Sequence, residues 1–258
     1  MSKSKYVVFN TSGDPLEIKE VGIPELKQGE ILVRNEYTTL CRSDLNTYSG
    51  KRKEKTPTIL GHEIVGRIAG FGPGASRMDS RNEELEINDL ITWAIFASDP
   101  NAKLAILGIP QKAAGLFKYG HEKITPENKL HGGLSEYTIL RANTPVAKVD
   151  ENVPLKLTSI INCAVATSAG ALRLAGNVKN KNVMISGSGM LGVVACAMCS
   201  VQGANKIVAL DSNPDRLETA KLFGAKSGIS SLKSSENPDS NEMNYSKSFH
   251  LASILHIS

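Results

Sequence analysis

The chain has 258 residues, an apolar content of 41%, a charged content of 22% and a formal net charge of +4 at pH 7. This is the composition of an ordinary globular protein, long enough for one large domain or two smaller ones. The only basic cluster, KRKEK at 51–55, contains no aromatic residues, so the sequence predicts no nucleic-acid partner.

The N-terminal sequence and the cysteine pattern indicate where in the cell the protein is expected. MSKSKYVVFN lacks the apolar core of a signal peptide, and no uncharged run reaches membrane-spanning length, so we expect no membrane partner. Cys196 and Cys199 lie within an apolar helical pattern and are interpreted as core residues, with a redox pair as the alternative. No disulfide framework is indicated, and a reducing cytoplasm is the expected location.

Residues 1–150 read as short strands rich in Val, Ile, Thr and Tyr, separated by turn sequences such as SGDP and GPGA. The expected strands are KYVVFN, LEIKEV, EILVRNEYTTL, IVGRIAGFG, LITWAI and SEYTIL. The pattern predicts an all-β domain over 1–150, in the form of a partly closed barrel.

The pattern changes after residue 150. SIINCAVATSAGALRLAG predicts a helix, and residues 181–225 then alternate strand, helix, strand and helix. This alternation predicts an α/β domain with a parallel sheet over 151–229. Residues 230–258 form an atypical serine-rich tail, whose apolar run FHLASILHI has no expected partner strand.

The α/β segment contains the motif Gly187-Ser188-Gly189-Met190-Leu191-Gly192. It follows the strand-like VMIS, opens a predicted helix, and precedes a second strand that ends in Asp211. This is the dinucleotide-binding arrangement, in which the pyrophosphate meets free N–H groups at the helix N-terminus. A carboxylate at 211 suits a ribose 2′-hydroxyl and repels a 2′-phosphate, which favours NAD over NADP. A tight turn without a ligand is the alternative.

Three residues far apart in the chain could form a metal site. Cys41 ends a predicted strand, His62 lies in Gly61-His62-Glu63, and Cys163 lies in INCAVAT. Two thiolates and one imidazole form a tetrahedral zinc set whose fourth position stays open, which is typical of catalytic zinc. Each residue taken alone has a simpler interpretation, as a core cysteine or a hydrogen-bonded histidine.

Taken in order, CRSD, GHEIVGRI, HGGLSEY, INCAVATSAGAL and GSGMLG resemble the zinc-containing medium-chain alcohol dehydrogenase family across roughly residues 15–228. The stretch GIPQKAAGLFKYGHE further resembles members proposed for phosphonate breakdown. The resemblance implies an N-terminal GroES-like β-barrel domain followed by a Rossmann domain. It also implies an enzyme that transfers hydride between an alcohol or polyol and NAD.

The resemblance also implies roles for individual residues. Cys41, His62 and Cys163 would be the zinc ligands, with Glu63 just behind the metal and able to exchange onto it. Asp44 would orient the imidazole of His62. Ser43 would hydrogen-bond the substrate oxygen and start a proton relay. The bound zinc would act as a Lewis acid that favours the alkoxide form of the alcohol.

Two departures from the family concern the metal and the proton path. Relatives often hold a second, structural zinc with four cysteines, and the corresponding positions here are Asp99, Ala102, Ala105 and Ala113. One carboxylate and three methyl groups cannot form a zinc cage, so we expect one catalytic zinc and no structural zinc. Asn46 stands where many relatives have a relay histidine, and an asparagine does not titrate near pH 7.

A third departure is that only one β-α-β-α-β half of the dinucleotide fold is present, ending near Gly228. We therefore expect an incomplete Rossmann sheet with one edge of its first strand unpaired, and either a homo-oligomer or a missing C-terminal half. The leading hypothesis is a zinc- and NAD-dependent alcohol dehydrogenase, or an inactive, incomplete fragment of one. The alternatives are a non-catalytic binding protein derived from that family and a zinc-free quinone reductase.

Overall fold

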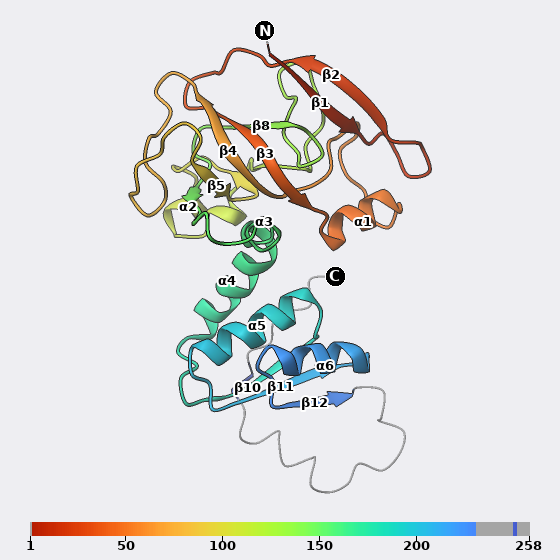
Figure 1. Cartoon of the computed structure of the whole chain (residues 1–258), viewed down its shortest axis with the longest axis vertical. Helices are drawn as coiled ribbons and strands as arrows, with labels where there is room; N and C mark the ends of the chain where they lie inside the picture. Colours follow the sequence, from red (N-terminus) through yellow and green to blue (C-terminus); the bar gives the residue numbers. More distant parts are fainter. Residues whose placement is uncertain (1, 231–249, 252–258) are drawn as a thin grey trace, which may run out of the picture. The chain divides into compact units, whose positions relative to one another are not determined.

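The computed structural model describes residues 2–230 and 250–251. Its internal contacts divide the chain into two compact units, Met1–Cys163 and Ala164–Ser258 (Figure 1). The division falls after the boundary at residue 150 that composition predicts, because helix α3 (Leu155–Thr158) contacts strands β3 and β4 of the first unit. The two units are described separately below.

The first unit is built on a five-stranded antiparallel sheet with the strand order β8-β3-β4-β5-β9. Its strands are β3 (Ile31–Thr39), β4 (Glu63–Phe71), β5 (Leu90–Trp93), β8 (Tyr137–Leu140) and β9 (Val146–Lys148). A separate antiparallel hairpin pairs β1 (Lys3–Val8) with β2 (Glu17–Gly22). The six predicted strands are present, whereas β9 was not predicted, since its three residues are too few to show a period.

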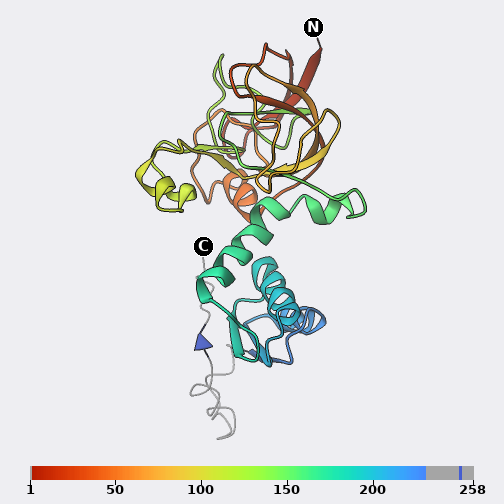
Figure 2. The ribbon, with the colours of Figure 1, turned by 90° about the vertical axis from the view of Figure 1, so that its left-hand side faces the viewer.

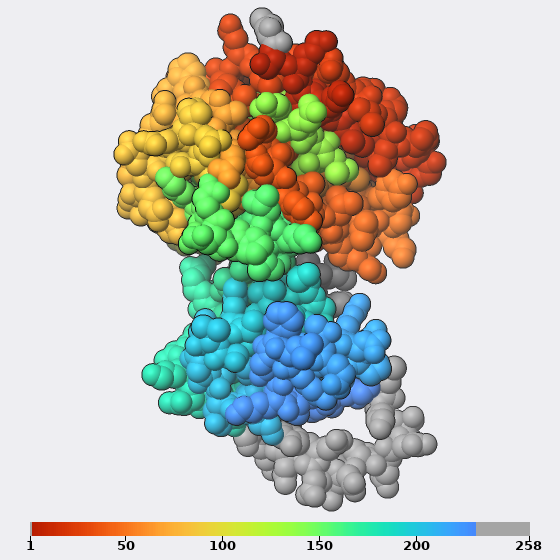
Figure 3. Space-filling model, viewed as in Figure 1, coloured from red at the N-terminus to blue at the C-terminus, as the bar shows by residue number. Residues whose placement is uncertain are grey.

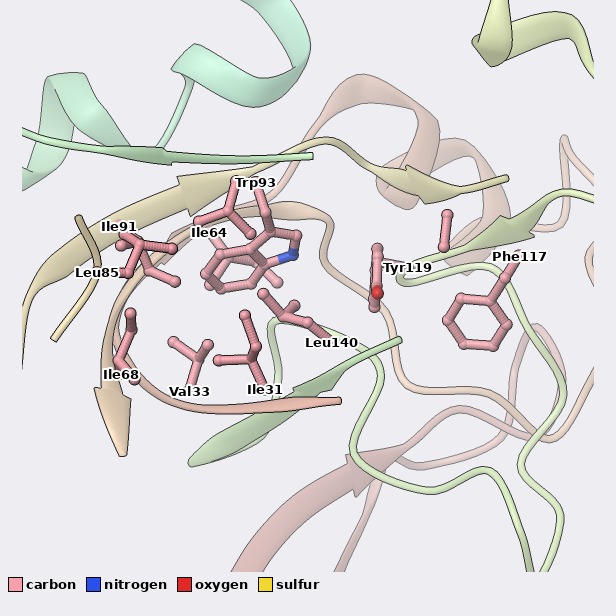
Figure 4. Close-up of a cluster of buried hydrophobic side chains, with 12 residues drawn as sticks. Ile31, Val33, Ile64, Ile68, Leu85, Ile91, Trp93, Phe117, Tyr119 and Leu140 are labelled. Carbon is pink, nitrogen blue, oxygen red and sulfur yellow. The ribbon is translucent and has the colours of Figure 1, made fainter. Parts of the chain in front are cut away.

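The core of this unit forms where alternating residues of the central strands point to one side of the sheet (Figure 4). Val33, Ile64 and Ile91 are fully buried, and Trp93 is 2% exposed. Burying each such side chain contributes roughly 1.5–3 kcal/mol. This apolar layer makes β3 and β4 a rigid support for the segments at their ends.

Short helices and strands in the first unit correct the all-β expectation. Helix α1 (Arg42–Tyr48) follows β3, so Cys41 does not end a strand but caps this helix. A lobe over residues 96–118, yellow-green in Figure 2, contains α2 (Lys103–Ile106) and the 3₁₀ turn η1 (Pro110–Lys112). The two-residue strands β6 (Phe96–Ala97) and β7 (Phe117–Lys118) pair at the base of this lobe.

His131 is a buried imidazole in the first unit that faces no carboxylate in the described residues. Its side chain is 1% exposed, its ring lies edge-on to Phe117, and neither ring nitrogen has a hydrogen-bond partner among the described residues. Burial, with smaller contributions from the charges of Arg141 and His121, lowers the pKa of His131 to about 4.

We expect this histidine to make the protein acid-sensitive. Between the ordinary pKa of 6.5 and the folded value of about 4, the unfolded chain binds more protons than the folded one. The stabilisation is therefore present above pH 6.5 and is lost as the pH falls toward 4. From about pH 7.5 to about pH 5, the free energy of unfolding should fall by about 2 kcal/mol more in the wild type than in His131→Phe. Urea denaturation at each pH measures this difference, and parallel curves would contradict it.

The second unit is a parallel sheet with the strand order β12-β11-β10-β13. Its strands are β10 (Asn182–Ser186), β11 (Lys206–Asp211), β12 (Ser227–Ser230) and β13 (His250–Leu251). Helices α5 (Met190–Val201) and α6 (Pro214–Leu222) contact neighbouring strands and each other, and together they form one face of this unit (Figures 1 and 3). Cys196 and Cys199 are fully buried on α5, as predicted for core residues.

One expectation for the tail is wrong at two positions. His250 and Leu251 pair in parallel with Val183 and Met184 of β10, so this part of the apolar run has a partner strand. The outer edge of β10 is therefore paired there. The rest of the predicted tail, residues 231–249 and 252–258, lies outside the described residues.

The segment Leu155–Ala175 is a continuous helical stretch made of α3, the π-helical turn η2 (Ile161–Val165) and α4 (Ala166–Ala175). Its 21 residues have a mean hydropathy of 1.3, so by length and composition alone it could cross a membrane. A single stretch of this kind is weak support for a membrane span, since the core helix of a globular protein has the same properties. Asn162, in the part of this stretch that belongs to the first unit, donates a hydrogen bond to the His62 carbonyl.

Candidate metal centre

Three potential metal ligands from separate segments meet in the first unit. The ligand atoms of Cys41, His62 and Cys163 all lie within 4.8 Å of one another. Cys41 precedes α1, His62 precedes β4, and Cys163 lies in the π-helical turn η2. His62 is 2% exposed whereas both cysteines are only half-buried, so the thiol side of the cluster is the more open one.

The spacing of the two sulfur atoms suits zinc. Cys41 Sγ and Cys163 Sγ are 4.0 Å apart. Two Zn–S bonds of about 2.3 Å at a tetrahedral angle place the sulfur atoms about 3.8 Å apart, whereas a disulfide holds them at about 2.05 Å. The cluster therefore has the size of a zinc site with two thiolates and one imidazole.

The charges in the cluster also favour a cation. Hydrogen bonding from Cys163 lowers the pKa of Cys41 to about 3, and the same contact, followed by burial, raises the pKa of Cys163. Burial opposes a charged imidazole, but Asp44 and Cys41 outweigh it and raise the pKa of His62 to about 10. Without a metal the cluster therefore holds a thiolate on Cys41, a thiol on Cys163 and an imidazole that keeps its proton. A divalent cation would take the place of the protons on Cys163 and His62.

Asp44 connects the two segments that carry Cys41 and His62. Its side chain is 1% exposed, and its Oδ2 accepts the Cys41 N–H at 2.9 Å in a capping box of α1. Its Oδ1 accepts the Gly61 N–H at 3.1 Å and lies 3.3 Å from His62 Nδ1. Burial opposes ionisation, but His62 and Gly61 hold the pKa of Asp44 below its ordinary value. This carboxylate therefore accepts hydrogen bonds from the backbone next to both potential ligands and lies at ion-pair distance from the imidazole.

The side chains of Ser43 and Glu63 lie next to the ligand cluster. Ser43 makes the smallest contributions to the lowered pKa of Cys41, through its backbone and its side chain. Glu63 is 5% exposed and its Oε2 accepts the Thr39 hydroxyl at 2.8 Å. Burial raises the pKa of Glu63. The hydrogen-bond donor on Glu63 is thus the neutral hydroxyl of Thr39.

Three contacts around the cluster were not predicted from the sequence. They are the Thr39 hydroxyl on Glu63, the Asn162 amide that donates to the His62 carbonyl at 2.8 Å, and the proximity of His121 to His62. Asn162 is adjacent in sequence to the predicted ligand Cys163, so its presence near the cluster could have been predicted. Nothing in the sequence placed Thr39 next to Glu63 or His121 next to His62, since these contacts form only through tertiary folding.

The backbone at His62 is packed too tightly to allow side chains on its neighbours. Gly61 has φ +91°, and a Cβ there would lie 3.1 Å from the Gly133 Cα. A Cβ on Gly120 would lie 3.1 Å from the His62 Cβ. Glycines are required at these contacts because three loops meet around one histidine.

The glycine motif of the second unit forms the loop between β10 and α5. Gly187 has φ +88°, Gly189 has open space around its missing Cβ, and a Cβ on Gly192 would collide with the Gly187 carbonyl oxygen. The three glycines therefore provide a tight turn, room for a ligand and close packing, respectively. Met190 is 58% exposed, whereas the Leu191 carbonyl accepts the Ser168 hydroxyl at 3.0 Å.

Asp211 reaches back from the end of β11 to this loop. Its Oδ2 accepts the Ser188 N–H at 2.7 Å and its Oδ1 accepts the Asn213 N–H at 2.9 Å. Burial opposes ionisation, but these backbone donors hold the pKa of Asp211 below its ordinary value. The structure thus brings Asp211 and the glycine loop together in the second unit, and the metal cluster together in the first.

Comparisons with known proteins agree with this arrangement. Residues 27–151 match the alcohol dehydrogenase GroES-like domain. Alcohol dehydrogenase 1 of Solanum tuberosum is 28% identical over 86% of this chain and 61% of its own length. An alcohol dehydrogenase from Thermotoga maritima superimposes with a TM-score of 0.83 and 26% identity, covering 91% of this chain and 65% of that one. Galactitol-1-phosphate dehydrogenase from Escherichia coli superimposes with a TM-score of 0.76 and 27% identity, covering 88% of this chain and 61% of that one.

A GroES-like domain with a cysteine–histidine cluster, followed by a partial Rossmann sheet, defines a medium-chain dehydrogenase fold. The chain is similar to medium-chain alcohol dehydrogenases in sequence and in fold, and its residues 27–151 match their GroES-like domain. It spans 61% of the length of the curated relative it matches.

Proposed function

We propose that the protein acts as a zinc- and NAD-dependent alcohol dehydrogenase that oxidises an alcohol or polyol by hydride transfer. The observation that carries this proposal is the convergence of Cys41, His62 and Cys163 within 4.8 Å. The names of its relatives, alcohol dehydrogenases and a galactitol-1-phosphate dehydrogenase, support an alcohol or polyol as the substrate class. The finer resemblance to phosphonate-related members stays a prediction.

In this proposal Cys41, His62 and Cys163 hold one zinc ion. When bound, zinc supplies a Lewis acid that withdraws charge from a substrate oxygen. The Ser43 hydroxyl would hydrogen-bond the alcohol oxygen and, as it takes up the alcohol proton, pass its own proton to water, while Asp44 keeps His62 in its orientation. We propose no second zinc at Asp99, Ala102, Ala105 and Ala113, since alanine offers no ligand atom.

The cofactor proposed is NAD. The N–H groups at the start of α5 are available to a pyrophosphate, and the space beside Gly189 allows close approach. The Asp211 carboxylate accepts hydrogen bonds and repels a 2′-phosphate. Four free cysteines, with the two at the cluster 4.0 Å apart, support a reducing cytoplasm as the location. Self-association and the absence of membrane and nucleic-acid partners stay predictions.

The function is tested by measuring NAD reduction with a panel of primary alcohols, secondary alcohols and polyols. We expect turnover that is abolished by dialysis against a chelator and restored by Zn²⁺, because the three ligands bind the ion reversibly. NADH binding without turnover on any alcohol would instead favour the non-catalytic binding protein. Turnover that survives complete removal of zinc would contradict the proposal.

A further inference from the structure

His121 lies against the face of the proposed zinc ligand His62. The two ring centroids are 4.7 Å apart with an interplanar angle of 37°, and His121 is 8% exposed. This approach depends on Gly120, which has φ +74° and whose missing Cβ would lie 2.9 Å from the Gly61 carbonyl carbon. The turn that carries His121 is therefore pressed directly onto the segment that carries His62.

A half-buried carboxylate, that of Glu54, lies on the far side of His121 at ion-pair distance. Glu54 Oε1 lies 3.1 Å from His121 Nδ1 and 2.7 Å from Arg52 Nη2, and the Glu54 side chain is 11% exposed. Burial opposes ionisation of this group, but His121 and Arg52 keep the pKa of Glu54 below its ordinary value. The result is a continuous row of polar groups that runs from Arg52 through Glu54 and His121 to His62.

Packing alone does not account for an imidazole at this position. An apolar ring would fill the same space without the desolvation cost of a buried imidazole and a half-buried carboxylate. His131, buried in the same unit, has neither a carboxylate partner nor a ring contact with His62. Asp44 already faces the Nδ1 atom of His62, which leaves the ring face as the side still to be supported.

We propose that His121, held by Glu54, is a positioning residue for His62 and thereby strengthens metal binding. Asp44 orients His62 from the edge of its ring, and His121 supports it from the face. Glu54, 3.1 Å from His121 Nδ1, supports the orientation of the His121 ring against His62. This inference rests on the proposed zinc function.

The test measures Zn²⁺ affinity of the full chain by competition with a chromophoric chelator. Partners outside the ligand set typically contribute about 10–100-fold to metal affinity. We therefore expect His121→Phe to weaken Zn²⁺ binding by about tenfold or more, and Glu54→Gln to weaken it in the same direction but less. The matched control His131→Phe removes a buried histidine that does not contact His62, and should stay within about twofold of the wild type.

Two further measurements separate positioning from folding. Loading with Co²⁺ gives a visible spectrum that reports ligand geometry, and we expect it to change in His121→Phe but not in His131→Phe. His121→Gln keeps an N–H donor for Glu54 and should recover part of the lost affinity, even if the phenylalanine variant folds poorly. The unfolding midpoint of each metal-free variant is recorded alongside.

The outcomes distinguish this inference from the proposed function. If the wild-type protein binds no Zn²⁺, both the proposed zinc function and the inference about His121 are wrong. Wild-type protein that binds Zn²⁺ while His121→Phe binds it equally well overturns the inference alone. Equal losses in His121→Phe and His131→Phe also overturn it, because they would assign the effect to general core damage.

Discussion

Cys41→Ser is expected to lower the zinc content of the purified protein from about one equivalent to less than about a tenth, since structural and catalytic zinc sites depend on each thiolate. Cys41 is the proposed zinc ligand whose backbone N–H donates to Asp44, and hydrogen bonding from Cys163 lowers its pKa to about 3, so it supplies the readily ionised thiolate. Elemental analysis after gel filtration gives the metal content, and alcohol-dependent NAD reduction should fall with it.

Cys196→Ala is the matched control for this experiment. Cys196 is fully buried on α5 in the second unit and lies outside the metal cluster. Its loss should reduce stability slightly through a small cavity while leaving the zinc content unchanged. Full zinc occupancy in Cys41→Ser, or equal zinc loss in both variants, would contradict the assignment of the site.

Gly189→Ala is expected to weaken NADH binding without loss of stability, whereas Gly192→Ala is expected to reduce both. A Cβ at Gly189 has nothing within 4 Å in the described structure, so the metal-free, cofactor-free protein should keep its stability. The same methyl group would occupy the space proposed for the pyrophosphate, and should weaken NADH binding by about tenfold or more, equal to about 1.4 kcal/mol. A Cβ at Gly192 would collide with the Gly187 carbonyl oxygen, and should lower the free energy of unfolding by about 1–3 kcal/mol in addition to weakening NADH binding.

NADH fluorescence titration and chemical denaturation together measure both quantities. Gly170→Ala is the control, because this glycine lies inside helix α4 with open space around it, and alanine there should be neutral or stabilising by up to about 1 kcal/mol. Unchanged NADH affinity in Gly189→Ala would show that the pyrophosphate does not approach this glycine. Unchanged stability in Gly192→Ala would contradict the close packing of α5 on the loop.

Patterns that repeat along the chain were sufficient to predict most of the architecture. Runs rich in Val, Ile, Thr and Tyr between turn sequences predicted six strands of the first unit, and the strand–glycine–helix–strand order predicted β10, α5 and β11. Helix α1 was missed because its seven residues hold too few apolar positions to show a helical period. Its one local signal was the acid at the third helical position, where Asp44 accepts the Cys41 N–H.

The pairing of β13 with β10 was also missed, for a different reason. Strand pairing is a long-range choice, and two residues in a serine-rich segment carry no alternation that would predict a partner. The same limit applies to the polar groups around the metal cluster. Glu54, Thr39 and His121 contribute side chains that only the folded sheet and loops bring near His62 and Glu63.

By itself the sequence determined which kinds of metal and cofactor the side chains of this chain are able to bind. Residue type alone decides that thiolates and imidazole can bind zinc and that a glycine loop can approach a pyrophosphate. The tertiary structure alone decided how the ligands are supported. Asp44 at the edge of His62, His121 at its face and Thr39 on Glu63 are contacts of a few ångströms, and these depend on where separate loops meet rather than on any spacing along the chain.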